Sequence, residues 1–393
     1  MFKEKGMAEE EVLGDLEKLL ARDATYSSGH PIASMSTIPN QLGVEVFSKT
    51  LEKNAGRLHT FKGSARVEQQ VVHMLGDLLH LDSPVGTTTS GGTESNMLAM
   101  LAARENAPKE VKKPEVIAPK SVHSSVDKAA WLLGVHLVKT EVDDVFKAIP
   151  FEIEEQISEN TIAIFCTAGT TYLGQVDPIA EIGSIARERD IPLHVDAAFG
   201  GFVIPFLKDA GHRSYDFDFK VEGVTSVSTD PHKMGMAPIP AGSLLFRDTK
   251  MLDMITRKVP YLRGASATQA SLLGTRPASS ILATWAIMRH LGRQGYRELV
   301  KECMQRTEHA HDRIKQNTLI EAAIEPVMNI LGITSKERDL DETVEEMEKR
   351  GWRMATSPIP PTMRLVVMPH VTEGAINAFF NDLDLVTTTI PAN

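Results

Sequence analysis

One basic side chain stands in an otherwise small and apolar stretch, SVSTDPHKMGMAPIPAG, residues 226–242. It is Lys233, which follows His232 and precedes a run of Met, Gly, Ala and Pro. A lysine in a loop is usually a solvated surface charge. An amine that is partly removed from water loses its proton more easily and becomes a nucleophile for carbonyl groups. Lys233 is therefore a candidate for carbonyl chemistry, with a surface charge as the alternative.

Three further groups of residues have types suited to binding an anion or a ring. Residues 90–93 belong to the stretch TSGGTESN, whose glycines allow backbone N–H groups and a helix N-terminus to approach a phosphate. The alternative is a tight turn with Thr93 as an ordinary helix cap. Asp196 in HVDAAFGG follows a buried apolar run, and His123 in HSS follows another. Taken singly, a structural carboxylate and a loop histidine are the commoner interpretations.

The elements around these residues predict where they lie. From about residue 83, β-branched or apolar runs alternate with helical stretches, which is typical of a mostly parallel sheet with helices on both faces. These runs are VGTTT, EVIAP, VHLVKT, TIAIFCT, IPLHVDAA, VTSVS and GSLLFRD. Residues 90–93, His123, Asp196 and Lys233 each follow or end a different run. The carboxyl edge of one sheet is therefore expected to bring them together.

Together, these groups describe one cofactor. A phosphate needs a glycine-rich cradle, a ring nitrogen needs a counter-charge and an aldehyde needs an amine, which fits pyridoxal phosphate. Lys233 would hold the aldehyde, Asp196 would keep the pyridine nitrogen protonated, and His123 would stack on the ring.

The motifs TSGGTESN, HSSVDKAA, HVDAAFGG and DPHKMG occur in the order and spacing of a known family. In these residues the sequence resembles the group II pyridoxal-phosphate-dependent amino-acid decarboxylases, and most of all the archaeal L-tyrosine/L-aspartate decarboxylases. The resemblance runs from about residue 25 to the C-terminal MRLVVMPHVT. It implies the PLP-dependent transferase fold of type I, an α/β fold with a mostly parallel seven-stranded sheet and a smaller C-terminal α+β domain. It also implies a homodimer with shared active sites.

The resemblance assigns single residues as well. Lys233 matches the lysine that binds the cofactor, Asp196 the partner of the ring nitrogen, and His123 the stacking histidine. The further cofactor-binding residues that it implies are Gly92, Thr93, Thr171, Ala198, His232 and, from the neighbouring subunit, Thr275. Weaker matches place His30, Arg364 and Tyr261 near the substrate.

Two departures from the animal aromatic decarboxylases of this family bear on the chemistry. Asp230 replaces an Asn before Pro-His-Lys, and a carboxylate beside a phosphate is unfavourable unless it is protonated or turned away. The loop that carries a catalytic Tyr in the animal enzymes is short here. Its stretch PYLRGASATQASLLGTR has one tyrosine, Tyr261, which precedes the loop. The sequence does not identify the group that returns a proton to the substrate α-carbon.

The predicted activity is decarboxylation of an L-amino acid to its amine and carbon dioxide. The candidate substrates are L-tyrosine, which gives tyramine for methanofuran, and L-aspartate, which gives β-alanine for coenzyme A, with tyrosine preferred. A second carboxylate requires a cation such as His30, whereas a phenol requires an apolar slot with residues such as Met35. Two alternatives stay open: a carbon–carbon lyase of the sphingosine-phosphate type, and a non-catalytic scaffold of the same fold.

Composition restricts the class of protein. The net charge of −10 over 393 residues, with mixed signs, argues against a nucleic-acid partner. The N-terminus lacks the apolar core of a signal peptide, and no stretch has the ~18 apolar residues of a membrane helix. Cys166 and Cys303 form no zinc or disulfide pattern, and His309 and His311 point to different faces of a predicted helix. We therefore expect a cytoplasmic protein without a bound metal.

Three regions are predicted along the chain. Residues 1–55 form an N-terminal helix and a substrate or dimer segment, residues 56–280 the large cofactor-binding domain, and residues 281–393 the small domain. The N-terminal helix, over residues 8–22, has an apolar stripe formed by Val12, Leu13, Leu16, Leu19 and Leu20.

Overall fold

The computed structural model describes residues 2, 4–57, 60–260, 268–336 and 339–389. Its helices are α1 (Glu9–Leu20), α2 (Gln41–Lys49), α3 (Lys62–Leu78), α4 (Gly92–Asn106), α5 (Ser124–Leu133), α6 (Pro150–Glu155), α7 (Ile179–Glu188), α8 (Ile204–Leu207), α9 (Thr249–Ile255), α10 (Ser279–Gln316), α11 (Leu340–Lys349) and α12 (Glu373–Thr389). None of these described helices is both long and apolar enough to cross a membrane.

The strands form three sheets, of which the largest has seven strands. They are β1 (Val85–Thr89), β2 (Glu115–Pro119), β3 (His136–Thr140), β4 (Thr161–Thr167), β5 (Leu193–Asp196), β6 (Val224–Thr229), β7 (Gly242–Phe246), β8 (Arg257–Lys258), β9 (Thr268–Gln269), β10 (Ile320–Ala322), β11 (Ile330–Ser335), β12 (Thr356–Pro358) and β13 (Pro361–Val366).

The large sheet has the order β1-β7-β6-β5-β4-β2-β3. β2 to β6 pair in parallel, whereas β7 runs antiparallel to both of its neighbours, β6 and β1. The other six strands therefore end at the same edge of the sheet. This arrangement confirms the predicted seven-stranded, mostly parallel sheet.

Both faces of this sheet are buried because apolar side chains occupy successive strand positions. Successive side chains of a strand point to opposite faces. In β4, Phe165 packs in the cluster that includes α4, α5 and α9, whereas Ile164 and Cys166 pack in the core on the opposite face. Near-continuous apolar runs are the expected consequence for a parallel sheet between two helical layers.

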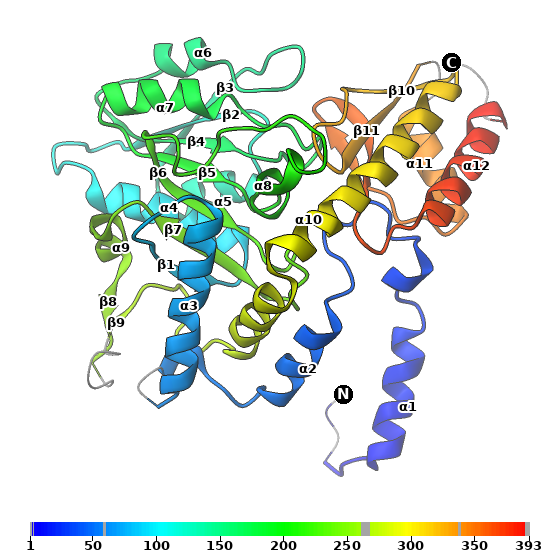
Figure 1. The fold of residues 1–393 in the computed structure, drawn as a ribbon, viewed down its shortest axis with the longest axis horizontal. Coiled ribbons are helices and arrows are strands. Elements are labelled where there is room, and N and C mark those ends of the chain that lie inside the picture. The colour runs from blue at the N-terminus through cyan, green and yellow to red at the C-terminus, as the bar shows by residue number, and fades with distance from the viewer. Residues whose placement is uncertain (1, 3, 58–59, 261–267, 337–338, 390–393) are drawn as a thin grey trace.

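The C-terminal part of the chain forms a second, four-stranded antiparallel sheet in the order β10-β11-β13-β12. The long helix α10 runs diagonally from the side of the large sheet to this small sheet (Figure 1). Gly292 interrupts the helix with φ 56° and ψ −173°, a conformation that glycine adopts readily.

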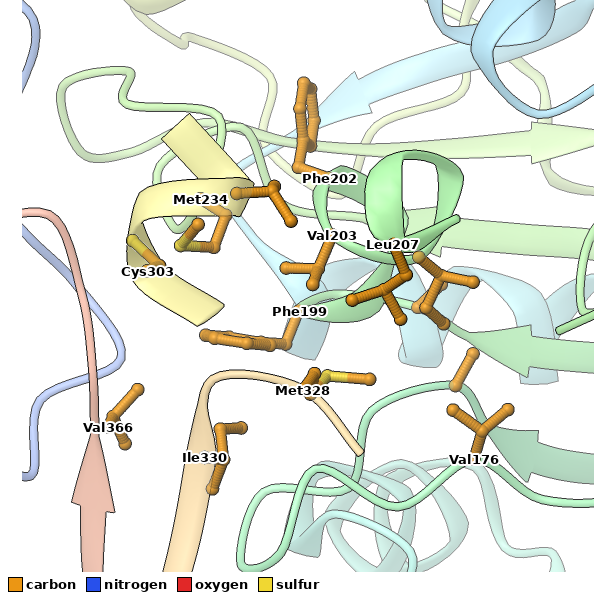
Figure 2. Close-up of a cluster of buried hydrophobic side chains, with 14 of the residues drawn as sticks. Val176, Phe199, Phe202, Val203, Leu207, Met234, Cys303, Met328, Ile330 and Val366 are labelled. Atoms are coloured by element: carbon orange, nitrogen blue, oxygen red, sulfur yellow. The ribbon is translucent and has the colours of Figure 1, made fainter. Parts of the chain in front are cut away.

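One buried apolar cluster connects the two sheets (Figure 2). Met328 and Ile330 from the small sheet and the segment before it lie beside Phe199, which follows β5. Met234 and Cys303 belong to the same cluster, and each of these five side chains is at most 2% exposed. Close packing therefore holds the segment after β5 against β11 of the small sheet and the segment before it.

Helix α1 lies apart from both sheets (Figure 1). It contains no buried residue. The apolar stripe is exposed at every position: Val12 49%, Leu13 51%, Leu16 47%, Leu19 72% and Leu20 52%. The helix itself agrees with the sequence pattern, but no described part of this chain covers its apolar face.

Candidate active site

A cavity of about 290 Å³ opens at the carboxyl edge of the large sheet. Its lining residues are Met35, Ser90, Gly91, Gly92, Thr93, His123, Thr167, Gly169, Thr171, Asp196, Ala198, Phe199, Asp230, His232 and Lys233. Residues 90–93 follow β1, His123 follows β2, Asp196 ends β5 and Lys233 follows β6. The structure thus brings together the groups that the sequence placed after different strands.

The glycine-rich segment after β1 leaves its backbone open to the cavity. Helix α4 begins at Gly92, and Gly91 before it has φ 149° and ψ 176°, a conformation available in practice to glycine alone. A β-carbon on Gly91 would lie 2.9 Å from Cε1 of His232, and one on Gly92 would lie 3.0 Å from Cβ of Ala198. Thr93 is inside the helix, so the alternative of an ordinary Thr93 cap is wrong.

Asp196 is a buried carboxylate at the end of β5. Its oxygens accept hydrogen bonds from Nδ2 of Asn96 at 2.7 Å, the N–H of Ala198 at 3.0 Å and the hydroxyl of Ser228 at 3.2 Å. Burial favours the protonated form, but the positive charge of Lys233 and the hydrogen bonds hold the pKa of Asp196 below its ordinary value. An ionised acceptor therefore lies at the floor of the cavity.

His123 caps the N-terminus of α5 with its ring. Nδ1 accepts a hydrogen bond from the N–H of Ser125 at 3.1 Å, so the neutral ring has its proton on Nε2. Burial lowers the pKa of His123, and Lys233 lowers it further, while the charge of Asp196 acts in the opposite direction. The ring is therefore neutral at pH 7.

Lys233 and Asp230 form a close pair beside the glycines. Nζ of Lys233 lies 3.4 Å from Oδ2 of Asp230, and the same oxygen accepts the N–H of Gly92 at 3.0 Å. Asp230 is 2% exposed, and its Oδ1 has no hydrogen-bond partner in the described chain. Asp230 is thus directed at the glycine-rich phosphate segment, residues 90–93, and not turned away from it. His232, whose Nδ1 accepts the N–H of Ala241 at 3.1 Å, lies on the same side.

Arg364, on β13, approaches the site from the small sheet. Its guanidinium donates to the carbonyl oxygens of Thr171 at 3.0 Å and Ala33 at 2.8 Å. Its Nε has no partner within the described residues, and burial lowers its pKa. Arg364 does not line the cavity itself, but it lies behind Thr171, which does.

Two other predicted site residues, His30 and Thr275, do not line the cavity of this chain. The ring of His30 packs edge-on against Trp352, with ring centroids 4.7 Å apart. Thr275 is exposed and away from the cavity. Tyr261 lies outside the described residues. Met35, considered for a phenol slot, does line the cavity.

Asn96, which contacts both Asp196 and Ser125, is a site residue that the sequence motifs did not reveal. Its signal was its position in TESN, four residues after Gly92, because residues four apart share one helix face. The partner of that face, Asp196, is 100 positions away along the chain. No local pattern could supply this pairing.

The pattern of the pyridoxal-dependent decarboxylase conserved domain matches residues 1–333. The chain belongs to the pyridoxal-dependent decarboxylase family. Curated members of this family match nearly the whole chain. The probable L-aspartate decarboxylase of Pyrococcus abyssi is 45% identical over 382 residues, 97% of this chain and 98% of that one. The L-aspartate decarboxylase of Thermococcus kodakarensis is 44% identical over 383 residues, 98% of each chain.

Another decarboxylase of the family has two substrates in its name. The probable L-tyrosine/L-aspartate decarboxylase of Methanothermobacter thermautotrophicus is 42% identical over 360 residues, 92% of this chain and 98% of that one. The predicted family and decarboxylase activity are therefore confirmed.

Solved structures share the fold. The sphingosine-1-phosphate lyase of Burkholderia pseudomallei has a TM-score of 0.90 at 27% identity, covering 99% of this chain and 93% of that one. The glutamate decarboxylase of Lactobacillus brevis has a TM-score of 0.91, covering 99% and 94%, but at 21% identity it supports the fold alone. The fold is thus common to decarboxylases and a lyase, and the fold by itself does not separate these activities.

Pyridoxal phosphate is the cofactor of this decarboxylase family, and the residues of the cavity fit it. The Gly91–Gly92 backbone at the start of α4 suits a phosphate. The ionised carboxylate of Asp196 suits a protonated ring nitrogen, and the Lys233 amine suits an aldehyde.

Proposed function

We propose that this chain removes the α-carboxylate of L-aspartate, giving β-alanine and carbon dioxide. The observation that carries the proposal is the convergence of Lys233, Asp196 and His123 on one cavity. L-Aspartate occurs in the names of all three relatives quoted above. Lys233, Asp196 and His123 each have a separate task in this decarboxylase site.

Lys233 would hold the cofactor through its amine, and Asp196 would keep the ring nitrogen protonated. Bound pyridoxal phosphate supplies an electron sink for the pair left on the α-carbon when carbon dioxide departs. His123 covers the site from the start of α5, where its neutral ring excludes water and offers an Nε2 proton as a donor. The glycines and Thr93 would bind the phosphate, with Ala198 and Thr171 on the cavity wall.

A carboxylate substrate is favoured by the charge of Arg364. Its guanidinium donates to two backbone carbonyls and has no acidic partner among the described residues. A partly buried cation without a counter-ion attracts an anion to its surroundings. We propose that this charge, acting from behind Thr171, attracts a substrate carboxylate to that side of the cavity.

L-Tyrosine is the second candidate. Met35 and Phe199 form apolar wall in the same cavity, which suits an aromatic ring. The Methanothermobacter relative, at 42% identity, has tyrosine in its name. In metabolism, we propose that β-alanine would serve coenzyme A synthesis and tyramine would serve methanofuran synthesis.

We propose that the active form is a homodimer in the cytoplasm. The stripe of α1 is an apolar surface of a length suited to a partner helix or groove. The exposed Thr275 would reach the cofactor phosphate of the neighbouring subunit. Both described cysteines are buried and free, which is usual in a reducing compartment.

The substrate is tested by incubating the pyridoxal-phosphate-loaded protein with L-aspartate, L-tyrosine, L-glutamate and a phosphorylated long-chain base in separate reactions. The products to quantify are β-alanine, tyramine and γ-aminobutyrate. We expect β-alanine to form fastest. Faster formation of tyramine would assign the chain to the second candidate, and an aldehyde from a phosphorylated long-chain base without carbon dioxide would assign it to the lyases.

A further inference from the structure

Asn96 lies beneath the cavity and contacts Asp196 directly. Its Nδ2 atom is 2.7 Å from Oδ2 of Asp196 and 2.8 Å from Oγ of Ser125. The residue is 1% exposed and does not line the cavity. A polar side chain at this depth is costly unless its donors and acceptors are paired. The pairing of Asn96 therefore indicates which way its amide points.

The amide orientation follows from Asp196 and agrees with His194, which lies on the other side of Asn96. The ionised Asp196 can only accept, so the Asn96 atom that faces it is the donor Nδ2. Burial lowers the pKa of His194 to about 4, so its ring is neutral and has one N–H. Nε2 of His194 lies 3.0 Å from Oδ1 of Asn96 and therefore donates to it, which leaves Nδ1, 2.9 Å from the hydroxyl of Ser226, as an acceptor.

An amide N–H directed at a carboxylate stabilises the ionised form. The titratable groups that face Asp196 are Lys233, from the segment after β6, and His194, from its own strand; His123 lies at the start of α5. Burial raises the pKa of Asp196, and this rise is opposed most by the charge of Lys233 and next by the hydrogen bond from Asn96. Loss of the Asn96 N–H would leave burial less opposed and would raise the pKa of Asp196.

We propose that Asn96 is a positioning residue that keeps Asp196 ionised and directed at the ring nitrogen of the cofactor. The proposal rests on the cofactor-binding site proposed above, and it assigns Asn96 an electrostatic task. If the side chain only fills space, a substitution that preserves its shape will be tolerated. An electrostatic role and a space-filling role therefore predict opposite orders of cofactor affinity for two variants of Asn96.

Asn96→Asp keeps the shape but replaces the N–H donor with an oxygen beside Asp196, and two adjacent carboxyl groups do not both ionise easily. Asn96→Leu has a similar size and no polar atom. If Asn96 acts electrostatically, Asn96→Asp should weaken the binding of pyridoxal phosphate more than Asn96→Leu does. If Asn96 only fills space, Asn96→Leu should weaken it more. Ser226→Ala is the matched control, because it removes a buried hydrogen bond at the far side of His194 and leaves Asn96 and Asp196 intact.

The first measurement is equilibrium binding of pyridoxal phosphate and of an analogue with CH in place of the ring nitrogen. We expect Asn96→Asp to weaken binding of pyridoxal phosphate by about tenfold or more and Asn96→Leu by less, with Ser226→Ala close to wild type. Binding of the analogue should change by less than about threefold in all variants, because it has no protonated ring nitrogen for the Asp196 carboxylate to pair with. Equal loss for both ligands, or a larger defect in Asn96→Leu, would overturn the proposal.

The second measurement is the pH profile of kcat, taken with KM. We expect the acidic limb of the profile to move to higher pH by about one unit in Asn96→Asp, with KM within about threefold of wild type. An unmoved limb would contradict the proposal. If the wild type binds pyridoxal phosphate in the expected pattern but decarboxylates no amino acid, the proposed function fails while the assignment of Asn96 stands.

Discussion

Oδ2 of Asp230 accepts the backbone N–H of Gly92 at 3.0 Å and lies 3.4 Å from the Lys233 amine. One carboxylate oxygen thus occupies the Gly92 N–H of the glycine-rich phosphate segment, residues 90–93, and lies beside the amine that would hold the cofactor. Its other oxygen, Oδ1, is buried without a partner in the described chain. Asp230 therefore competes within the protein for both groups that the cofactor needs.

Asp230→Asn should tighten the binding of pyridoxal phosphate. The amide oxygen can still accept the Gly92 N–H, while the negative charge near the phosphate is removed. We expect the dissociation constant to fall by about tenfold, equivalent to about 1.4 kcal/mol. Titration of the apoprotein, followed by absorbance, measures it.

Asp218→Asn is the matched control for this titration. Asp218 is also buried, at 3% exposed, and accepts the backbone N–H of Lys220 at 3.0 Å, but it does not line the cavity. The Asp218→Asn variant should bind pyridoxal phosphate with the same dissociation constant as wild type. Unchanged or weaker binding by Asp230→Asn would show that the carboxylate does not oppose the cofactor.

His194→Gln should reduce the loss of stability at acidic pH. The pKa of His194 in the folded protein is about 4, below its ordinary 6.5, so its contribution to stability is present above pH 6.5 and is lost as pH falls toward 4. Between pH 7 and pH 5 the wild type should lose about 2 kcal/mol more than the variant. Urea unfolding of both proteins at the two pH values measures this difference, and an equal loss would contradict the neutral His194 with which the Asn96 orientation agrees.

Arg364→Met should weaken the binding of L-aspartate. Removal of the charge takes away the cation proposed to attract a substrate carboxylate, and we expect KM to rise by about tenfold or more. Arg364→Lys keeps the charge without the planar fork and should give an intermediate KM. Steady-state kinetics of both variants tests this, and a KM for Arg364→Met equal to that of wild type would exclude Arg364 from substrate binding.

A double variant, Leu16→Asp with Leu19→Asp, should dissociate the proposed dimer. These side chains are 47% and 72% exposed on α1, so charges there cost little in a single chain but much in a buried interface. Light scattering should show a shift from two chains toward one. Phe151→Asp, at an apolar position on α6 that is 69% exposed, is the control and should leave the mass unchanged. A double variant that stays dimeric would remove α1 from the interface.

The sequence could predict the elements that local patterns determine. Each strand of the large sheet appears in the sequence as a β-branched or apolar run, and the central strands are apolar because both of their faces are buried. The positions of Lys233 and Asp196 followed from the rule that parallel strands end at one edge. These inferences needed only residue types along a short stretch and one rule of sheet topology.

Relationships between distant segments could not be predicted in the same way. The contact of Asn96 with Asp196 depends on how α4 packs over β5, and the direction of Asp230 depends on the loop after β6. The sequence allowed Asp230 to be turned away, whereas its side chain accepts the Gly92 N–H. The sequence pattern predicted the α1 helix with its apolar stripe, but a pattern does not say whether a surface that covers the stripe belongs to the same chain.

Decarboxylation of L-aspartate by this chain is proposed to depend on the Lys233 amine. The most direct measurement is release of labelled carbon dioxide from L-aspartate that carries ¹⁴C in its α-carboxylate, by the loaded wild type and by Lys233→Ala. We expect release by the wild type, with one β-alanine formed per carbon dioxide, and none above background by Lys233→Ala. Turnover by Lys233→Ala, or no labelled carbon dioxide from the wild type, would contradict this proposal.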